Sequence, residues 1–346
     1  MMDIAIRRSA IAVLIAIASG CGYDSNAPEY RTPPVADANE GLWIASGIEP
    51  AILRLAPDQL LSSGRQIAST TVTTSSASLL TISGIAFDDA GTMWVASAED
   101  SLVLAFSPDI LAASGLSVAS TVIAPTERSL RAPSGIAFDG LQRLWVANFE
   151  TGTVVRFDPE QLAFGGAQTP AVTISGLTGP TALAFDASGS LWVANSPKDA
   201  VFKYAPAQLE TSGSPQPEVI VSTSEGSLSS PFALAFDAAG KLWVANIGTA
   251  TIAAFSPEML AATGSPAPQI EIGSSGAGSF VIPVGLAFDT EGSLWVVGGD
   301  NTLYKFAQSK LGETGKPAPS AQLFVDDHSL LSGVAFWPKP AQLPIN

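Results

Sequence analysis

The strongest constraint on the fold is a short tryptophan-centred phrase that recurs six times along the chain. The copies are GLWIAS (41–46), TMWVAS (92–97), RLWVAN (143–148), SLWVAN (190–195), KLWVAN (241–246) and SLWVVG (293–298). Successive tryptophans lie 51, 51, 47, 51 and 52 residues apart. A repeat of about 50 residues built from strand-forming sequence is typical of propeller blades rather than of helical or leucine-rich solenoids. The chain is therefore expected to be all-β.

A second phrase predicts the number of blades and the way in which the ring closes. It precedes each later tryptophan strand, as SGIAFDDAG (83–91), SGIAFDGLQ (134–142), TALAFDASG (181–189), FALAFDAAG (232–240) and VGLAFDTEG (284–292). A sixth copy, SGVAFWP (332–338), has no tryptophan strand after it, and the first tryptophan strand has no such phrase before it. We expect the C-terminal strand to complete the N-terminal blade, because an unpaired edge invites aggregation. The prediction is a closed six-bladed β-propeller.

Each blade is expected to hold four strands. Phrases of the GIAF and LWVAN type are joined by D-x-x-G, which is a tight-turn signal, so they form a hairpin. Gly135 and Ala137 are expected on the crowded side near the axis, and Ile136 and Phe138 are expected to fill the space between blades. A third strand, a short helical turn that begins at a proline, and an outermost strand such as 214–222 complete the unit. Three residues are predicted to cap such turns: Ser107, Asp158 and Ser256.

The paired phrases resemble a known superfamily over residues 41–338. It comprises the six-bladed propellers of the NHL-repeat, streptogramin (virginiamycin B) lyase-like and gluconolactonase/regucalcin-like proteins. The resemblance implies a site at the propeller axis. Gluconolactonase-like enzymes hold a divalent metal there, partly through an asparagine in a P-N-G phrase, but this chain carries Ser134, Thr181, Phe232 and Val284 at the matching places. Streptogramin lyase-like enzymes use a histidine base and a W-x-x-E phrase, whereas here the phrase ends in Asn or Ser and the one histidine is His328.

The first residues are predicted to be an export signal. Arg7 and Arg8 form a positive start, an apolar run follows at 11–18, and small residues precede Cys21. This pattern resembles a bacterial lipoprotein signal, in which the cysteine becomes the lipidated N-terminus; the alternative is an ordinary secretory signal with an incidental cysteine. We therefore expect a signal peptide at 1–20, a lipidated Cys21 with a flexible tether to residue 40, a propeller at 41–340 and a tail at 341–346. The predicted location is the bacterial cell envelope, on a periplasmic or outer-membrane surface.

Charge excludes one class of partner. The chain carries 16 basic and 31 acidic side chains and a net charge of -15, so it repels nucleic acid and anionic headgroups. We expect the lipid anchor to be the sole membrane contact and the protein to be a monomer.

Polar side chains are predicted to line a funnel at one end of the axis. In an antiparallel meander, the end of the second strand and the start of the inner strand meet at the same face. The candidate binding residues there are Ser46, Ser97, Asn148, Asn195, Asn246, Ser134, Thr181, Glu99 and Glu150. The asparagines could bind a sugar, a peptide or Ca²⁺ through their amides, or they could begin loops because asparagine tolerates left-handed backbone. The repeated Asp88, Asp139, Asp186, Asp237 and Asp289 are predicted to be turn residues and not ligands.

The sequence favours a noncatalytic function. No catalytic residue and no cofactor are assigned, apart from the Ca²⁺ or other divalent ion that the axis could hold. The leading interpretation is a lipid-anchored binding or scaffold propeller whose funnel takes a peptide, a glycan or an envelope protein. The alternatives are a metal-assisted hydrolase or lyase with a divergent site, and a propeller whose partners bind the variable outer turns.

Overall fold

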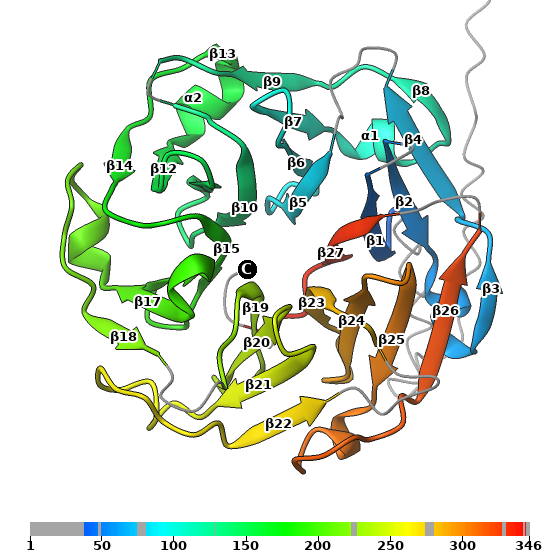
Figure 1. Ribbon diagram of the computed structural model, residues 1–346. Helices are drawn as coiled ribbons and strands as arrows, with labels where there is room; N and C mark the ends of the chain where they lie inside the picture. Colours follow the sequence, from blue (N-terminus) through cyan, green and yellow to red (C-terminus); the bar gives the residue numbers. More distant parts are fainter. Residues whose placement is uncertain are drawn as a thin grey trace, which may run out of the picture. The chain divides into compact units, whose positions relative to one another are not determined.

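The computed structural model describes residues 38–47, 50–74, 81–127, 129–222, 227–273, 280–326, 330–341 and 343. These residues form six sheets arranged around one axis, as Figure 1 shows. The predicted signal peptide, Cys21, most of the predicted tether and His328 lie outside the described residues. The prediction of a six-bladed, all-β propeller is confirmed.

Each blade is an antiparallel meander of four strands that runs outward from the axis. The inner strands are β27 (Leu331–Trp337), β5 (Ile82–Phe87), β10 (Pro133–Phe138), β15 (Pro180–Phe185), β19 (Pro231–Phe236) and β23 (Pro283–Phe288). The second strands are β1 (Gly41–Ser46), β6 (Met93–Ser97), β11 (Leu144–Asn148), β16 (Leu191–Asn195), β20 (Leu242–Asn246) and β24 (Leu294–Gly298). The third strands are β2 (Ala51–Leu55), β7 (Leu102–Phe106), β12 (Thr153–Phe157), β17 (Ala200–Tyr204), β21 (Thr251–Phe255) and β25 (Thr302–Phe306). The fourth strands are β4 (Thr70–Thr74), β9 (Thr121–Ala124), β14 (Val172–Ile174), β18 (Val219–Val221), β22 (Ile270–Gly273) and β26 (Ala321–Val325).

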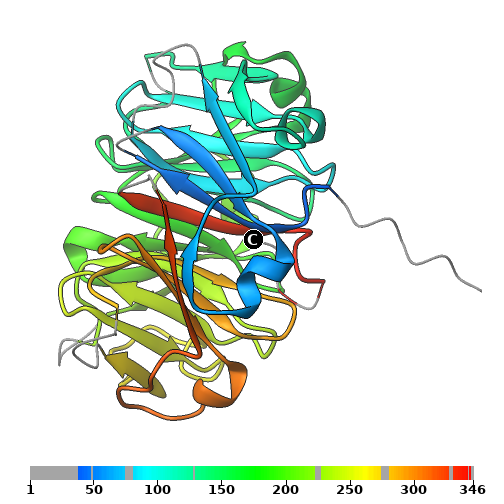
Figure 2. The ribbon, with the colours of Figure 1, turned by 90° about the vertical axis from the view of Figure 1, so that its right-hand side faces the viewer.

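The ring closes as predicted. β27 from the C-terminal end pairs antiparallel with β1 from the N-terminal end, with Trp43 opposite Ala335. Figure 2 shows the two strands side by side in the same sheet. We number the blades from this one, so blade 1 holds β27, β1, β2 and β4, and blades 2 to 6 follow along the chain.

Three sheets contain a fifth strand that the sequence did not predict. The connection after the third strand reaches back to the outermost strand of the preceding blade and pairs with it in parallel. The added strands are β3 (Gly64–Gln66), β8 (Gly115–Ser117) and β13 (Gly166–Ala167), which pair with β26, β4 and β9. At the other three boundaries a single bridge replaces the strand, at Gly213, Gly264 and Gly315. Every outer edge is thereby covered, which protects it against edge-to-edge association.

The connections also contain the short helical segments. Those that follow the third strands are α1 (Pro108–Leu111), α2 (Pro159–Phe164), η1 (Pro57–Leu61), η3 (Pro206–Leu209) and η4 (Gln308–Lys310), and η2 (Ser196–Lys198) lies in a loop. Ser107 and Asp158 occupy the N-cap positions as predicted, but their side chains make no capping hydrogen bond. Instead, Gln161 Oε1 accepts the backbone N–H of Asp158 at 3.0 Å. In the described part of the chain, no helix is long and apolar enough to span a membrane.

One aromatic contact is repeated around the ring and holds neighbouring blades together. The tryptophan of each second strand lies edge-on to an inner-strand phenylalanine of the next blade, with ring centroids 5.9 to 6.2 Å apart. The pairs are Trp43–Phe87, Trp94–Phe138, Trp145–Phe185, Trp192–Phe236, Trp243–Phe288 and Trp295–Phe336. Edge-to-face pairs add about 1 kcal/mol beyond the area that they bury. The tryptophans therefore recur for a structural reason.

The placement predicted for the small inner-strand residues is partly wrong. Gly135 lines the upper axial cavity, but a Cβ there would point at the next inner strand and lie 2.7 Å from the Cα of Ala182. Ala137 likewise packs in the core between blades 3 and 4. Small residues are needed because neighbouring inner strands approach each other closely. Ile136 and Phe138 pack between blades 2 and 3 as predicted, and Ile136 also lines the axial channel.

Candidate functional site

The upper face of the propeller is the face at which the inner strands begin, and the lower face carries the D-x-x-G turns. On the upper face every inner strand has an irregular register with its neighbour. A residue in the left-handed backbone region precedes each inner strand: Thr81, Ala132, Gly179, Ser230, Ile282 and Leu330. For a β-branched residue such as Ile282 (φ 47°) this conformation is strained, and strain of this kind gathers at functional sites.

The inner-strand hydroxyls tie neighbouring blades together around the axis. Each donates to a backbone carbonyl of the next inner strand: Ser83 to Pro133 (2.6 Å), Ser134 to Pro180 (2.7 Å), Thr181 to Pro231 (2.9 Å) and Ser332 to Ile82 (2.6 Å). Ser83, Ser134 and Thr181 line the upper axial cavity, which has a volume of about 110 Å³, and Phe232 and Val284 take the corresponding positions in blades 5 and 6. The structure thus brings the candidates Ser134 and Thr181 to the axis as predicted. Their hydroxyl groups already donate hydrogen bonds to the carbonyls of Pro180 and Pro231.

The three asparagines are buried beneath the upper loops and do not line either axial cavity. Asn148 accepts the backbone N–H of Arg131 at 3.0 Å and donates to the carbonyl of Ser129 at 2.8 Å. Asn246 holds the equivalent loop of blade 5, and Asn195 accepts the N–H of Thr178 at 2.9 Å. Their amides therefore fasten the loops that lead into the inner strands. The predicted ligand contact of these amides stays a prediction.

The remaining candidates separate into buried and exposed groups. Ser46 and Ser97 are fully buried, and the hydroxyl of Ser97 lies 3.2 Å from Asp100 Oδ2. Glu99 and Glu150 are exposed on upper loops, where Glu99 accepts a hydrogen bond from Thr81 at 2.8 Å.

Sequence reasoning missed a group of exposed apolar side chains on the upper face. Phe149, Val281, Ile282 and Leu330 have between 43% and 57% of their surface exposed, and all belong to the loops that begin or follow the strands at this face. Phe149 directly follows the Asn148 that ends β11, and Leu330 directly precedes β27. The sequence signal was available but weak, because most other repeats hold small or polar side chains at these loop positions, whereas Ile247 and Leu80 are also apolar.

No group of three or more His, Cys, Asp or Glu side chains in the described residues is arranged to hold a metal. Ca²⁺ or another divalent ion at the axis therefore stays a prediction, without a cluster of carboxylate, histidine or cysteine ligands among these residues. On the lower face, each repeated aspartate accepts the indole N–H of its own blade's tryptophan, as in Asp139 with Trp145 at 2.9 Å, and two backbone N–H groups of the turn. The prediction that these aspartates are turn residues is confirmed.

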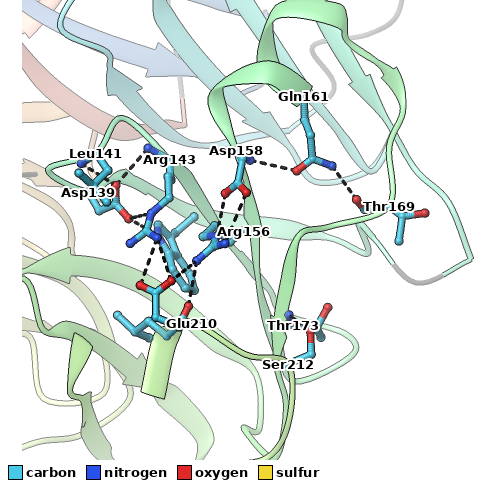
Figure 3. Close-up of polar contacts among 12 residues, drawn as sticks. Asp139, Leu141, Arg143, Arg156, Asp158, Gln161, Thr169, Thr173, Glu210 and Ser212 are labelled. Carbon is cyan, nitrogen blue, oxygen red and sulfur yellow. Dashed lines mark hydrogen bonds and ion pairs between the residues drawn. The ribbon is translucent and has the colours of Figure 1, made fainter. Parts of the chain in front are cut away.

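A charged network joins blades 3 and 4 on the lower side (Figure 3). Arg143 pairs with Asp139 at 2.6 Å and with Glu210 at 3.2 Å, while Arg156 pairs with Glu210 at 3.4 Å and with Asp158 at 2.8 Å. Burial alone would lower the pKa of the Arg143 guanidinium, but hydrogen bonds and charges from Asp139 and Glu210 outweigh it and raise the pKa. Each charge faces an opposite charge, so the network is a connection between blades.

No protein-family profile matches this chain. No curated protein sequence matches it significantly. Solved structures do resemble it. A protein of unknown function from Bacteroides caccae aligns with a TM-score of 0.60 and 12% identity, over 85% of this chain and 97% of that one. A structure of a nidogen/laminin complex aligns with a TM-score of 0.59 and 14% identity, over 85% of this chain and 96% of that one. A catalytically inactive virginiamycin B lyase from Staphylococcus aureus with quinupristin aligns with a TM-score of 0.53 and 10% identity, over 80% of this chain and 84% of that one.

The shared feature is the fold. At these identities the likeness extends to the propeller and not to any activity, and it agrees with the resemblance that the repeated phrases indicated.

Proposed function

We propose that this chain is an exported, lipid-anchored binding propeller whose upper face takes a peptide or a segment of a partner protein. The observation that carries the proposal is a set of exposed apolar side chains on the upper-face loops: Phe149 in blade 3, Val281 and Ile282 in blade 6, and Leu330 in blade 1. Exposed apolar side chains that gather on one face are typical of interaction sites. The strained backbone of Ile282 lies in the same set.

Electrostatics favours a basic partner. Glu99 and Glu150 are exposed on the same face as the apolar side chains, and the whole chain carries a net charge of -15. Opposite charge on a partner would speed its encounter with this surface and select against acidic competitors. The partner that fits best is therefore a segment with both apolar and basic side chains, and a glycan is the less favoured ligand.

The position at which the chain enters the propeller supports presentation of the upper face. Gly41 begins β1 opposite Trp337, at the lower end of the blade, so the predicted tether joins the propeller on the side away from the proposed surface. This arrangement suits a protein that captures a partner in the envelope.

The alternative, a metal-assisted hydrolase or lyase, has weaker support. It rests on the fold shared with a virginiamycin B lyase, and the described residues supply no carboxylate or histidine cluster to perform the reaction. A binding role needs no such cluster.

The test uses a displayed library of random peptides followed by synthetic peptides from the selected sequences. The upper-face variant combines Phe149→Ser with Ile282→Asn, since asparagine tolerates the left-handed backbone at position 282. The matched control combines Leu61→Ser with Phe164→Ser, which are 80% and 86% exposed on the circumference. We expect selected peptides to be basic and apolar, and to lose at least about tenfold in affinity for the upper-face variant alone. Equal affinity for both variants would refute the proposal.

The anchor is tested separately. Cells fed a labelled fatty acid should transfer label to the parent chain and not to the Cys21→Ser variant. Label on both chains, or on neither, would remove the lipid anchor from the proposal without affecting the upper-face site.

A further inference from the structure

The lower half of the axial channel is a cavity of about 360 Å³. One branched aliphatic side chain from each blade lines it: Ile85, Ile136, Leu183, Leu234, Leu286 and Val334. The same six residues line the smaller upper cavity, so they form an apolar ring at the middle of the channel. We call this set the aliphatic ring.

Below the aliphatic ring the wall combines apolar and polar surface. Ala86, Ala287, Phe288 and Phe336 are among the apolar lining residues there. A concave space of this size that offers apolar side chains together with polar groups is typical of a site for a small molecule. Side chains contributed by all six blades surround the axis, so a narrow molecule on the axis would contact every blade at once.

The polar groups of the cavity stand together at its lower mouth. Asp89 pairs with Lys339 at 3.2 Å, and Gln142 Oε1 accepts the backbone N–H of Asp89 at 2.8 Å. Lys339, Asp89 and Gln142 all line the cavity. The mouth therefore offers a cation, an anion and an amide to the polar end of a bound molecule.

The C-terminal segment crosses this mouth. It leaves β27 in blade 1, reaches blade 2 through the ion pair of Lys339 with Asp89, and ends with Leu343 packed against the core between blades 5 and 6. Pro340, Ala341 and Leu343 form part of the cavity wall, and the N–H of Leu343 donates to the carbonyl of Pro340 at 3.1 Å. We call residues 338–341 together with Leu343 the strap.

We propose that the lower axial cavity binds the aliphatic chain of a single-chain amphiphile, such as a fatty alcohol or fatty acid. The chain lies along the axis against the aliphatic ring, and the head group lies at the mouth beside Lys339 and Gln142. The strap must shift for the ligand to enter, because its residues form part of the wall. This site is on the opposite face from the surface proposed above and does not depend on it.

The test measures displacement of a dansyl-labelled undecanoic acid from the full chain carrying Cys21→Ser, so that no detergent competes. Unlabelled octanol, nonanol and decanol are then titrated, and decanoate and decylamine distinguish acidic from basic head groups. We expect saturable binding that tightens about fourfold with each added methylene. We also expect decanol to bind more tightly than decanoate or decylamine, because Lys339 and Asp89 already pair with each other at the mouth. Binding that is not saturable, or affinity independent of chain length, would overturn the proposal.

Two variants locate the site. Leu234→Phe fills the channel and should weaken binding at least about tenfold, whereas Leu61→Phe, on the exposed circumference, should leave it unchanged. If Leu234→Phe fails to fold by circular dichroism, Leu343→Ser replaces it. Loosening the strap should increase both association and dissociation rates at least about threefold, since entry is gated by it. Unchanged affinity in a folded Leu234→Phe protein, or unchanged rates in Leu343→Ser, would refute this assignment.

Discussion

Replacing Asp237 by alanine tests how each blade is held together on the lower face. The carboxylate of Asp237 accepts three hydrogen bonds within its own hairpin. Oδ1 accepts the N–H groups of Ala239 at 2.9 Å and Lys241 at 3.0 Å, and Oδ2 accepts the indole N–H of Trp243 at 3.0 Å. The described contacts of this aspartate include no ion pair, unlike those of Asp139, so the substitution removes these bonds without disturbing a salt bridge.

The expected loss of stability follows from those contacts. Trp243 is 1% exposed, so its indole N–H has no route to water when the carboxylate is removed, which costs about 2 kcal/mol. The two turn N–H groups can be solvated after the change, and each contributes about 1 kcal/mol. We therefore expect Asp237→Ala to lower the free energy of unfolding by about 4 kcal/mol.

Urea denaturation followed by far-UV circular dichroism measures this change, provided that the slope of the unfolding free energy against urea concentration equals that of the parent. Asp109→Ala removes an exposed carboxylate and serves as the matched control. A double-mutant cycle with Trp243→Phe should give a coupling energy of about 1 to 2 kcal/mol. A loss below about 0.5 kcal/mol, or additive single changes, would refute the idea that the aspartate supports the tryptophan.

Three further predictions concern the packing of the blades. Asn246→Ala should lower the free energy of unfolding by about 2 to 3 kcal/mol, because it removes the two hydrogen bonds that hold the loop before β19. An unchanged midpoint of thermal unfolding would contradict this prediction. Gly135→Ala forces a Cβ to within 2.7 Å of the Cα of Ala182 and should lower the free energy of unfolding by about 1 to 3 kcal/mol. Gly213→Ala, with open space around it, is the control. Equal midpoints of thermal unfolding for the two variants would show that the inner strands can separate freely. Burial raises the pKa of the Tyr204 phenol from 10.0 to about 12, so the folded state holds this proton more tightly than the unfolded state. The resulting contribution to the free energy of unfolding is present below pH 10 and is lost as the pH rises to about 12. Urea unfolding at several pH values should show that Tyr204→Phe loses less stability over this range than the parent. An equal loss in both proteins would contradict the raised pKa of Tyr204.

The ring could be predicted from the sequence because repetition carries long-range information. A single blade has no stable partner for its faces, so equal spacing of the tryptophans already implies neighbours on both sides. Two phrases had no partner within their own repeat, at 332–338 and at 41–46. They could be matched only by pairing with each other in one blade, and β27 does pair with β1. The fifth strands escaped prediction because their strand-forming segments are at most three residues long.

The site was harder to predict because side-chain direction depends on local backbone irregularities. Strand alternation placed Asn148, Asn195 and Asn246 at the upper face, but the register shifts and left-handed residues beside them place their amides under the loops. The same limitation affected Gly135, whose small size reflects the approach of the next inner strand. The partners of the asparagine amides lie 17 to 19 residues earlier in the same blade, whereas the strand that limits Gly135 belongs to the next blade.

Repetition also separates the residues that build the propeller from those that distinguish it. A residue that recurs in most blades is explained here by a contact made in each of them: aspartate holds tryptophan, tryptophan contacts the next phenylalanine, and the inner-strand hydroxyls join neighbouring strands. Such residues are committed to the fold and have little capacity left for a ligand. Recognition is then expected where the repeat is broken, and the apolar residues Phe149, Ile282 and Leu330 break it on the upper face, as the strap does on the lower face. In a propeller of near-identical blades, the departures from the repeat identify the candidate binding surfaces more directly than the repeat itself.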